Sequence, residues 1–218
     1  MGYPILLDLQ GRLVVMIGGG RVAARKVADL LEAGAQIILI SPTLHPDLAA
    51  LGSHIEHYQT AYAPGMMTEM IDWDLNPLLV FAATDSPAVN QQVADEAHDL
   101  GILVNRADNG RGHDFSSMAV IRRGDITIAT GTGNSSPALA AHLRAKIEAQ
   151  IGEEYTILAR WLGELRPVVK AKIPPEARPS LWRAILQSPA LDHLRASDEA
   201  GARAIIDALI AAAIKEGE

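Results

Sequence analysis

The strongest constraint on the fold is a strand, a glycine turn and a helix near the N-terminus. Apolar, β-prone residues at 13–17 run into Gly18-Gly19-Gly20, and a helical pattern follows. Gly18, Gly20 and Ala23 have the G-x-G-x-x-G/A spacing of dinucleotide-binding turns. In such turns the glycines allow a tight bend and a close approach of the pyrophosphate, and the helix N-terminus offers free N–H groups. We therefore predict dinucleotide binding here, with a plain strand-to-helix turn as the alternative.

Composition narrows the class of protein. The 218 residues are 49% hydrophobic and 21% charged, which is ordinary for a globular protein, and the net charge of −7 argues against broad nucleic-acid binding. The chain has no cysteine, which excludes disulfides, thiolate metal sites and a cysteine nucleophile. Residues 1–10 do not resemble a secretory signal, and no apolar run is long enough to span a bilayer. We predict a cytoplasmic protein with no nucleic-acid and no membrane partner.

Strands and helices alternate up to residue 112, which predicts a parallel sheet in a Rossmann-like domain, 1–112. The expected strands are 5–7, 13–17, 36–40, 55–58 at an edge, 78–83 and 102–105. The expected helices are 22–33, 48–51 and 87–100.

The pattern then changes. Strands are expected at 118–122 and 125–130 as a hairpin-like pair, followed by a polar loop at 131–137 and a helix at 138–151. Ser136 is a good N-cap, with Pro137 at the first helical position. Further helices are expected at 153–169, 180–187 and 198–214. The predicted fold class is thus α/β: a Rossmann-like domain, a small α+β region at 113–151 and a C-terminal helical domain at 152–218.

The end of the second strand leaves the choice of cofactor open. NAD-binding units often place a carboxylate there to bond the ribose, but this chain has Ser41-Pro42-Thr43. Ser41 or Thr43 could bond a ribose more weakly, and no arginine indicates a 2′-phosphate pocket. The alternative is that Ser41-Pro42 is only a turn.

Several motifs taken in order resemble one known family. They are Gly18 to Lys26, Leu31-Glu32-Ala33-Gly34-Ala35, Phe81 to Asn90, Gly101 to Asn105, and Ser135 to Ala140. This order is similar to that of the precorrin-2 dehydrogenase and sirohydrochlorin ferrochelatase family, of the type found at the N-terminus of siroheme synthases. The resemblance is clear from residue 3 to about residue 150.

The resemblance implies both a reaction and an assembly. Precorrin-2 would lose a hydride to NAD and protons to solvent or a base, giving sirohydrochlorin. Some members also insert a metal, so Fe²⁺ or Co²⁺ could be a transient substrate. The family's dimerisation region would correspond to 113–151, which implies a homodimer that binds a tetrapyrrole in a cleft between domains.

Asp108 is the candidate catalytic residue. It matches the family's key aspartate just after the Val-Asn pair that ends the last Rossmann strand, here Val104-Asn105. A carboxylate at the carboxyl end of a parallel strand lies where open α/β sheets bind ligands, and it could act as a general base. The alternative is a loop residue that makes an Asx-turn with Asn109-Gly110.

The other candidate site residues divide into two groups. Loop hydroxyls and amides could bond the acetate and propionate groups of the substrate, and arginines could pair its eight carboxylates, although each is individually typical of a solvated surface. Arg123 and Arg144 are further candidates of this kind. The cofactor residues are Gly18, Gly19, Gly20, Arg21, Val22, Ser41, Pro42, Thr43 and Thr84; the substrate residues are Thr132, Asn134, Ser135, Arg106, Arg111 and Arg122.

His113 is the one candidate for handling a metal, because it stands beside Asp114. A lone loop histidine is more often simply exposed. The following Ser116-Ser117-Met118 departs from the apolar-apolar-Pro of the family, which leaves the shape of the tetrapyrrole pocket open.

Two other classes of function compete with this reading. One is an NAD-binding, redox-sensing regulatory module without catalysis. The other is a different small-molecule dehydrogenase, but the sequence lacks a Tyr-x-x-x-Lys constellation, and Lys26 and Lys146 stand alone.

Overall fold

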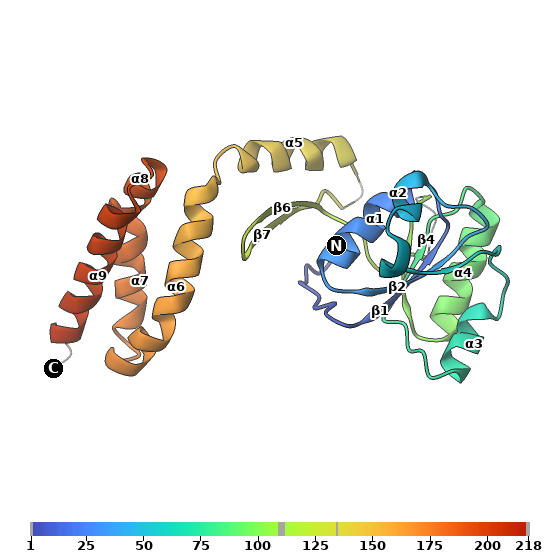
Figure 1. Cartoon of the computed structure of the whole chain (residues 1–218), viewed down its shortest axis with the longest axis horizontal. Helices are drawn as coiled ribbons and strands as arrows, with labels where there is room; N and C mark the ends of the chain where they lie inside the picture. Colours follow the sequence, from blue (N-terminus) through green and yellow to red (C-terminus); the bar gives the residue numbers. More distant parts are fainter. Residues whose placement is uncertain (1, 109–111, 134, 217–218) are drawn as a thin grey trace. The chain divides into compact units, whose positions relative to one another are not determined.

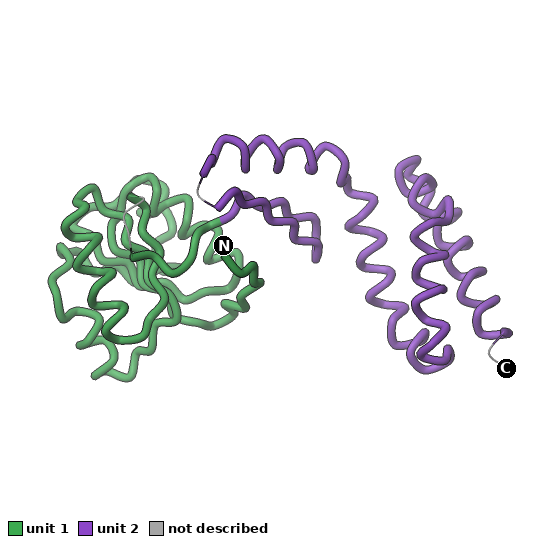
Figure 2. The backbone as a smooth tube through the Cα atoms, turned by 180° about the vertical axis from the view of Figure 1, so that it is seen from behind, with its two compact units in different colours: residues 1–117 green, residues 118–218 purple. Residues whose placement is uncertain are grey.

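The computed structural model describes residues 2–108, 112–133 and 135–216. The chain divides into two compact units, Met1–Ser117 and Met118–Glu218 (Figure 2). The first unit extends beyond residue 112, because Phe115 packs against its core. The separation of 113–151 from 152–218 stays a prediction.

A five-stranded sheet forms the centre of the first unit (Figure 1). Its order is β3-β2-β1-β4-β5, and every neighbouring pair is parallel. The parallel Rossmann-like sheet is therefore confirmed, with the third strand at an edge as expected. The strands are β1 (Leu13–Ile17), β2 (Gln36–Ile40), β3 (Glu56–Tyr58), β4 (Leu79–Ala82) and β5 (Leu103–Arg106).

Helices cover both faces of this sheet because successive strand residues point to opposite faces. The helices are α1 (Arg21–Glu32), α2 (Pro46–Ala49), a 3₁₀ turn η1 (Gly52–His54), α3 (Met66–Asp72) and α4 (Pro87–Asp99). On one face, Val14, Met16 and Phe81 pack with α1 and α2. On the other, Val15, Ile17 and their neighbours pack with α3 and α4.

The structure differs from several expectations for this unit. Residues 5–7 form no strand, and Leu6 is 86% exposed. An apolar run becomes a strand only where a neighbouring strand pairs with it, and none of the described strands pairs with this segment. Helix α3 was not expected at all, and α2 begins two residues before the predicted helix at 48–51. Short elements of this kind depend on tertiary packing more than on local pattern.

The second unit begins with an antiparallel pair, β6 (Ala119–Arg123) and β7 (Ile126–Thr130), joined through Gly124 at φ +54°. The turn lies at Gly124-Asp125, one residue later than predicted. Helix α8 was not expected, whereas the other helices match their predictions to within a few residues. The helices are α5 (Pro137–Glu148), α6 (Glu153–Lys172), α7 (Arg178–Gln187), α8 (Ala190–Arg195) and α9 (Glu199–Glu216).

The last four helices share one apolar core that includes Trp161, Ile185 and Ile206. Within the described ranges, none of the helices has the length and apolar character needed to cross a bilayer.

Candidate functional site

The carboxyl ends of β1 and β4 mark the point where the strand order reverses. From β1 the chain proceeds to β2 on one side, and β4 lies on the other side. Ligands of open α/β sheets bind in the crevice outside such a point. The loops after β1, β2 and β4 are joined there by backbone hydrogen bonds from Gly18 to Ile40, from Ala83 to Ile17 and from His45 to Gly19. The predicted cofactor residues of these loops thus lie along one edge of the sheet.

The three glycines of the turn differ in their surroundings. Gly18 has φ +108°, and a Cβ there would lie 2.7 Å from the carbonyl carbon of Ala83. A Cβ on Gly19 would meet the carbonyl oxygen of Thr43 and would lie 2.7 Å from Ser41 Oγ. Around Gly20, no described atom lies within 4 Å of the Cβ position. The packing of the protein itself therefore requires Gly18 and Gly19, whereas Gly20 borders open space.

That open space lies at the start of α1. Gly20 is the N-cap, and within the described chain no side chain caps this helix end and no acidic residue occupies its first turn. The side chain of Arg21 is exposed beside it. Uncapped N–H groups and the positive end of the helix dipole together favour an anion such as a phosphate.

The loop after β2 supports the glycine turn. Ser41 is buried, and its hydroxyl donates to the carbonyl of Thr43 at 2.8 Å. The ring of His57 bonds the carbonyl of Ser41 at 2.9 Å. Since the Ser41 proton is already used, its oxygen can only accept from a ligand, while Pro42 and Thr43 are exposed.

Asn90 fixes the loop after β4, a role that the sequence analysis missed. Its Oδ1 accepts from the Thr84 backbone N–H at 3.1 Å and lies 2.8 Å from Thr84 Oγ1, and its Nδ2 donates to the Thr84 carbonyl at 3.1 Å. The residue is fully buried on the apolar face of α4, beside Val93 and Ala94. A polar residue within an apolar helical stripe was the signal that could have identified it.

Asp108 follows the carboxyl end of β5, where the sequence placed it. Arg106 holds its carboxylate through two hydrogen bonds, Nε to Oδ1 at 3.1 Å and Nη2 to Oδ2 at 3.0 Å. The guanidinium also donates to Gln91 and is buried, with 4% of the side chain exposed. Arg106 therefore orients Asp108 and is not presented to solvent for a substrate carboxylate.

Lys26 has partners in the structure that the sequence analysis did not predict. Its Nζ donates to Asn105 Oδ1 at 3.0 Å and to Ser117 Oγ at 2.9 Å, and it lies 4.9 Å from the centre of the Phe81 ring. Burial, and then the nearby charge of Arg25, lower the pKa of Lys26 to about 8. The partners lie far away in sequence, so only the position of Lys26 near Ala23 and Leu30 on the inner face of α1 could have indicated this.

Asp114 has partners other than His113. Its Oδ2 accepts from the Val104 backbone N–H at 2.9 Å, and its Oδ1 lies 3.2 Å from the ring of His98. Among the described residues, no group of three or more His, Asp or Glu side chains is placed to hold a metal ion. Metal handling by His113 stays a prediction.

The loop at 131–137 is held by its own hydroxyls. Thr132 Oγ1 donates to the Ser136 carbonyl at 2.9 Å, and Ser135 Oγ bonds the Thr132 carbonyl. Ser136 Oγ accepts from the Leu139 N–H at 3.2 Å, so its predicted role as an N-cap is confirmed. Asn134 and Arg111 lie outside the described residues.

The arginines of the second unit differ in their partners. Arg144 pairs with Glu148 at 2.6 Å, and Arg123 lies 3.4 Å from the same carboxylate. Arg122 is exposed on β6. Arg123 and Arg144 thus each have an acidic partner within the protein.

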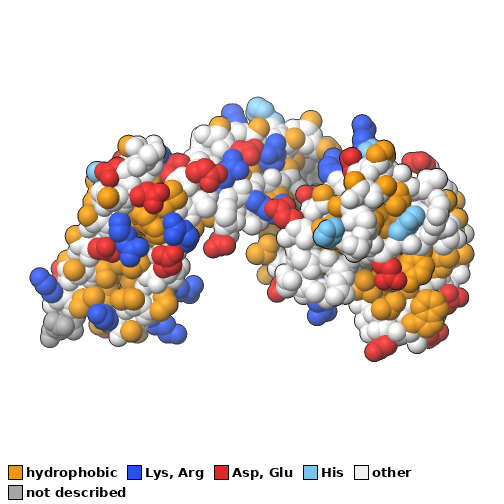
Figure 3. Space-filling model, viewed as in Figure 1, with side chains coloured by type: hydrophobic (Ala, Val, Ile, Leu, Met, Phe, Trp, Pro, Cys, Tyr) orange, Lys and Arg blue, Asp and Glu red, His pale blue; other side chains and the backbone are white. Residues whose placement is uncertain are grey.

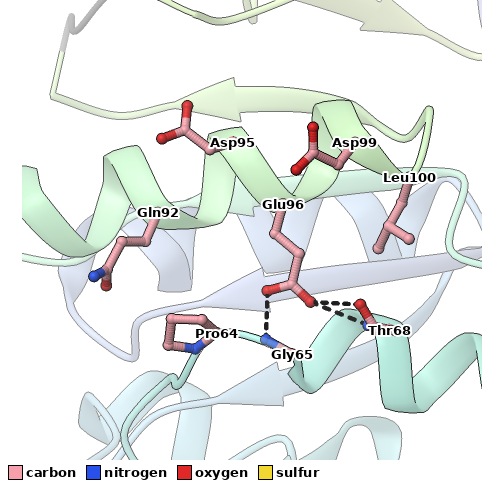
Figure 4. A pocket seen from close by; sticks show the side chains of 8 residues that line it. All are labelled: Pro64, Gly65, Thr68, Gln92, Asp95, Glu96, Asp99 and Leu100. Carbon is pink, nitrogen blue, oxygen red and sulfur yellow. Dashed lines mark hydrogen bonds between the residues drawn. The ribbon is translucent and has the colours of Figure 1, made fainter.

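A depression between α3 and α4 is lined by residues with a structural role (Figure 4). Glu96 lines it and accepts from the N–H groups of Gly65, Met67 and Thr68 at 3.0–3.1 Å, which caps the start of α3. Burial opposes ionisation, but the hydrogen bonds from Tyr62, Gly65 and Thr68 outweigh it and lower the pKa of Glu96. The depression contains none of the residues predicted for the site.

Comparison with known families supports the identification of the first unit as a nucleotide-binding domain. A family model described as "Putative NAD(P)-binding" matches residues 5–119, more than half of the chain. The chain belongs to this NAD(P)-binding family. A second family model, described as "Sirohaem synthase dimerisation region", matches residues 154–210 of the chain. The siroheme synthase resemblance drawn from the sequence motifs is therefore confirmed.

Individual relatives support the same family assignment. The chain is 38% identical over 213 residues to a siroheme synthase of Chromobacterium violaceum and 36% identical over 207 residues to one of Nitrosospira multiformis, covering 96% and 94% of this chain. It covers only 44% and 43% of those proteins, so it spans less than half of their length. The solved structure of SirC, precorrin-2 dehydrogenase, has the same fold, with a TM-score of 0.73 at 23% identity over 94% of this chain and 99% of that one.

One assignment needs revision. The sequence analysis assigned dimerisation to 113–151, whereas the model named for dimerisation matches the helices at 154–210. The match thus covers α6, α7 and α8 and most of α9, and it gives no support to the earlier placement.

Proposed function

We propose that this chain binds NAD at the glycine turn and oxidises precorrin-2 to sirohydrochlorin. The observation that supports this most is the open space beside Gly20 at the uncapped start of α1, located at the switch point of the sheet. Asp108 follows β5, whose carboxyl end lies at the same edge. The named activity of SirC and the similarity to siroheme synthases supply the choice of substrate.

The cofactor would be held mainly by backbone groups. The N–H groups of Arg21 and Val22 would bind the pyrophosphate, with Gly20 leaving the space it needs. Ser41, Pro42 and Thr43 would border the ribose, and Thr84 would border the other half of the cofactor, in the position that Asn90 fixes. Bound NAD supplies the hydride acceptor.

Asp108 would act as the general base on the substrate. Conversion of precorrin-2 to sirohydrochlorin removes one hydride, which reduces NAD to NADH, and one proton, which the carboxylate of Asp108 would accept. Arg106 keeps that carboxylate in one orientation through its paired hydrogen bonds. The proton then passes to solvent, and the base is restored.

The substrate carboxylates would be bound by Arg122, together with Asn134 and Arg111. Thr132 and Ser135 would border them without donating, because their hydroxyl protons are used within the loop. The metal insertion of the family is a second step that we propose at the same carboxylate, with Fe²⁺ or Co²⁺ as a substrate. The rate of metal insertion into sirohydrochlorin can be measured with and without the protein for each ion. Rates that are no greater with the protein would refute this second step alone.

We also propose that the chain forms a homodimer through its C-terminal helices. Val168 on α6 and Leu186 on α7 are 42% and 57% exposed, inside the region matched by the dimerisation model. Figure 3 shows hydrophobic side chains at the surface of these helices, interspersed with charged ones. Sedimentation at micromolar concentration should give twice the mass of 23.3 kDa.

The decisive experiment supplies precorrin-2 with NAD and, separately, with NADP. Formation of NADH together with sirohydrochlorin absorbance is expected, and Asp108→Asn should reduce turnover by about 10²–10⁴-fold, the usual contribution of a general base. Asp125→Asn, in the exposed hairpin turn, is the control that should retain full activity. Tight NAD binding without oxidation of precorrin-2 would instead favour the regulatory module.

A further inference from the structure

The chain that follows Asp108 returns to the strand it has just left. The backbone N–H of Asp114 donates to the Val104 carbonyl at 2.9 Å, and the Asp114 carboxylate accepts from the Val104 N–H at 2.9 Å. Asn105 Nδ2 donates to the carbonyl of Phe115 at 2.7 Å. Because β5 is the outer strand of the sheet, residues 114 and 115 cover part of its exposed edge. Their contacts with Val104 and Asn105 form the base of the Asp108 loop, a name used here for the described residues 107–108 and 112–113.

Lys26 joins this base from another part of the chain, 79 residues before Asn105. Its ammonium group bonds Asn105 on β5 and Ser117 just beyond the base, and it faces the Phe81 ring on β4. Phe115 packs edge-on against the same ring, with ring centres 5.4 Å apart. One side chain of α1 thus connects both chain segments that form the base of the loop.

Helix α1 also begins at the glycine turn. Gly20 is its N-cap, and Lys26 lies in its second turn, so one continuous helix joins the proposed pyrophosphate site to the base of the Asp108 loop. We propose that Lys26 is a positioning residue that holds the Asp108 loop against α1, and so fixes the proposed base relative to the bound cofactor. This inference rests on the proposed function for its catalytic consequence, but the positioning itself is independent of it.

The surroundings of Lys26 support a specific role for its hydrogen bonds. Burial, and then Arg25 on the same helix, lower the pKa of Lys26, whereas Asp29 raises it. The groups that contact it from β4, β5 and the segment after the loop are Phe81, Asn105 and Ser117, all of them neutral. An apolar side chain would fill this position without desolvating a charge, so the lysine is accounted for by the two bonds that it donates.

The test combines amide exchange with kinetics for three variants. Lys26→Met keeps an unbranched side chain one atom shorter and removes both hydrogen bonds, and Lys26→Arg keeps donors and charge. Lys146→Met on α5 is the control for loss of an exposed lysine. In Lys26→Met at pH 7, the amides of Val104 and Asp114 should exchange at least about tenfold faster, while the amides of β1 remain unchanged. Lys26→Arg should restore most of this protection, and Lys146→Met should match the parent protein.

The turnover number should change in the same variants as amide exchange. A displacement of the base should lower kcat of Lys26→Met by about 10–100-fold, with KM for NAD unchanged, because the glycine turn is intact. Unchanged exchange at Val104 and Asp114 would overturn the proposal, as would a rise in KM for NAD with kcat preserved. If the parent protein does not oxidise precorrin-2, the proposed function fails, but the exchange measurement still decides whether Lys26 holds the loop.

Discussion

The loops after β1 and after β5 lie at the same edge of the sheet but obtain their shapes in different ways. The turn after β1 is determined by the backbone, since Gly18 and Gly19 leave no room for a side chain. The base of the Asp108 loop after β5 is determined by side chains, because Lys26, Asn105 and Asp114 hold it. A backbone constraint is local and tolerates almost no substitution, whereas a side-chain constraint is distributed over distant residues. Substitutions in the two loops should therefore differ in both the size and the kind of their effects.

Gly18→Ala should have the largest effect on stability. The alanine would have to adopt φ +108° with its Cβ against the carbonyl group of Ala83. Strain and overpacking each cost about 1–3 kcal/mol, so we expect a loss of about 2–6 kcal/mol in the free energy of unfolding, measured by urea titration. Gly163→Ala is the control, because its Cβ would meet open space within a helix, and it should not destabilise. A Gly18→Ala protein as stable as the parent would contradict the backbone explanation.

Glu96→Gln tests a loop that is held by a side chain away from the site. The carboxylate of Glu96 accepts three backbone N–H groups at the start of α3, so its loss should cost about 1–3 kcal/mol at pH 7. The hydrogen bonds lower the pKa of Glu96 in the folded state, so its stabilisation is complete above the unfolded pKa of about 4.3 and is lost as the pH falls further.

The measurement for Glu96 is thermal unfolding of both proteins between pH 2 and pH 7. The difference between parent and variant should shrink below about pH 4. Asp99→Asn, on the same helix and in the same depression, is the control and should unfold like the parent at pH 7. An equal difference at pH 7 and pH 3 would show that the carboxylate charge contributes nothing.

The same contrast explains what the sequence could predict. Strands β1 and β2 were predicted to the residue, and the glycine turn was found, because apolar runs and glycines act through local geometry. Asp108 was placed correctly at the end of β5. The contacts of Lys26, Asn90 and Arg106 could not be predicted, since they depend on which side chains the folded sheet brings together. Residues 5–7 show the opposite case. Their local apolar pattern predicted a strand, but none of the described strands pairs with them.

Lys26 should make stability depend on pH in the alkaline range. Burial lowers its pKa in the folded state to about 8, whereas an unfolded lysine titrates near about 10.4. Between these values the unfolded state binds more protons, so the free energy of unfolding should rise with pH. One pKa unit corresponds to about 1.4 kcal/mol, and with partial exposure to solvent we expect a rise of about 1–2 kcal/mol from pH 8 to pH 10.

Denaturant titrations at pH 8 and pH 10 would measure this rise as a difference between proteins. Lys26→Met and Lys26→Arg should both lack it, because neither side chain loses a proton in this range. Lys146→Met should retain it. A rise of equal size in all four proteins would assign the pH dependence to other groups.

Gly20→Ala should have the smallest effect on stability and yet a clear effect on cofactor binding. Gly20 has φ −83°, which alanine adopts readily, and the added methyl group would meet no described atom within 4 Å. Alanine is a poorer N-cap than glycine, but it also restricts the unfolded chain, so the net change should be below about 1 kcal/mol. The same methyl group would occupy the space proposed for the pyrophosphate, so calorimetry should show NAD binding at least about tenfold weaker, since about 1.4 kcal/mol suffices for that. Unchanged NAD affinity in a fully folded Gly20→Ala protein would mean that the open side of the turn is not where the dinucleotide binds, and the comparison between the two loops would then lose its functional meaning.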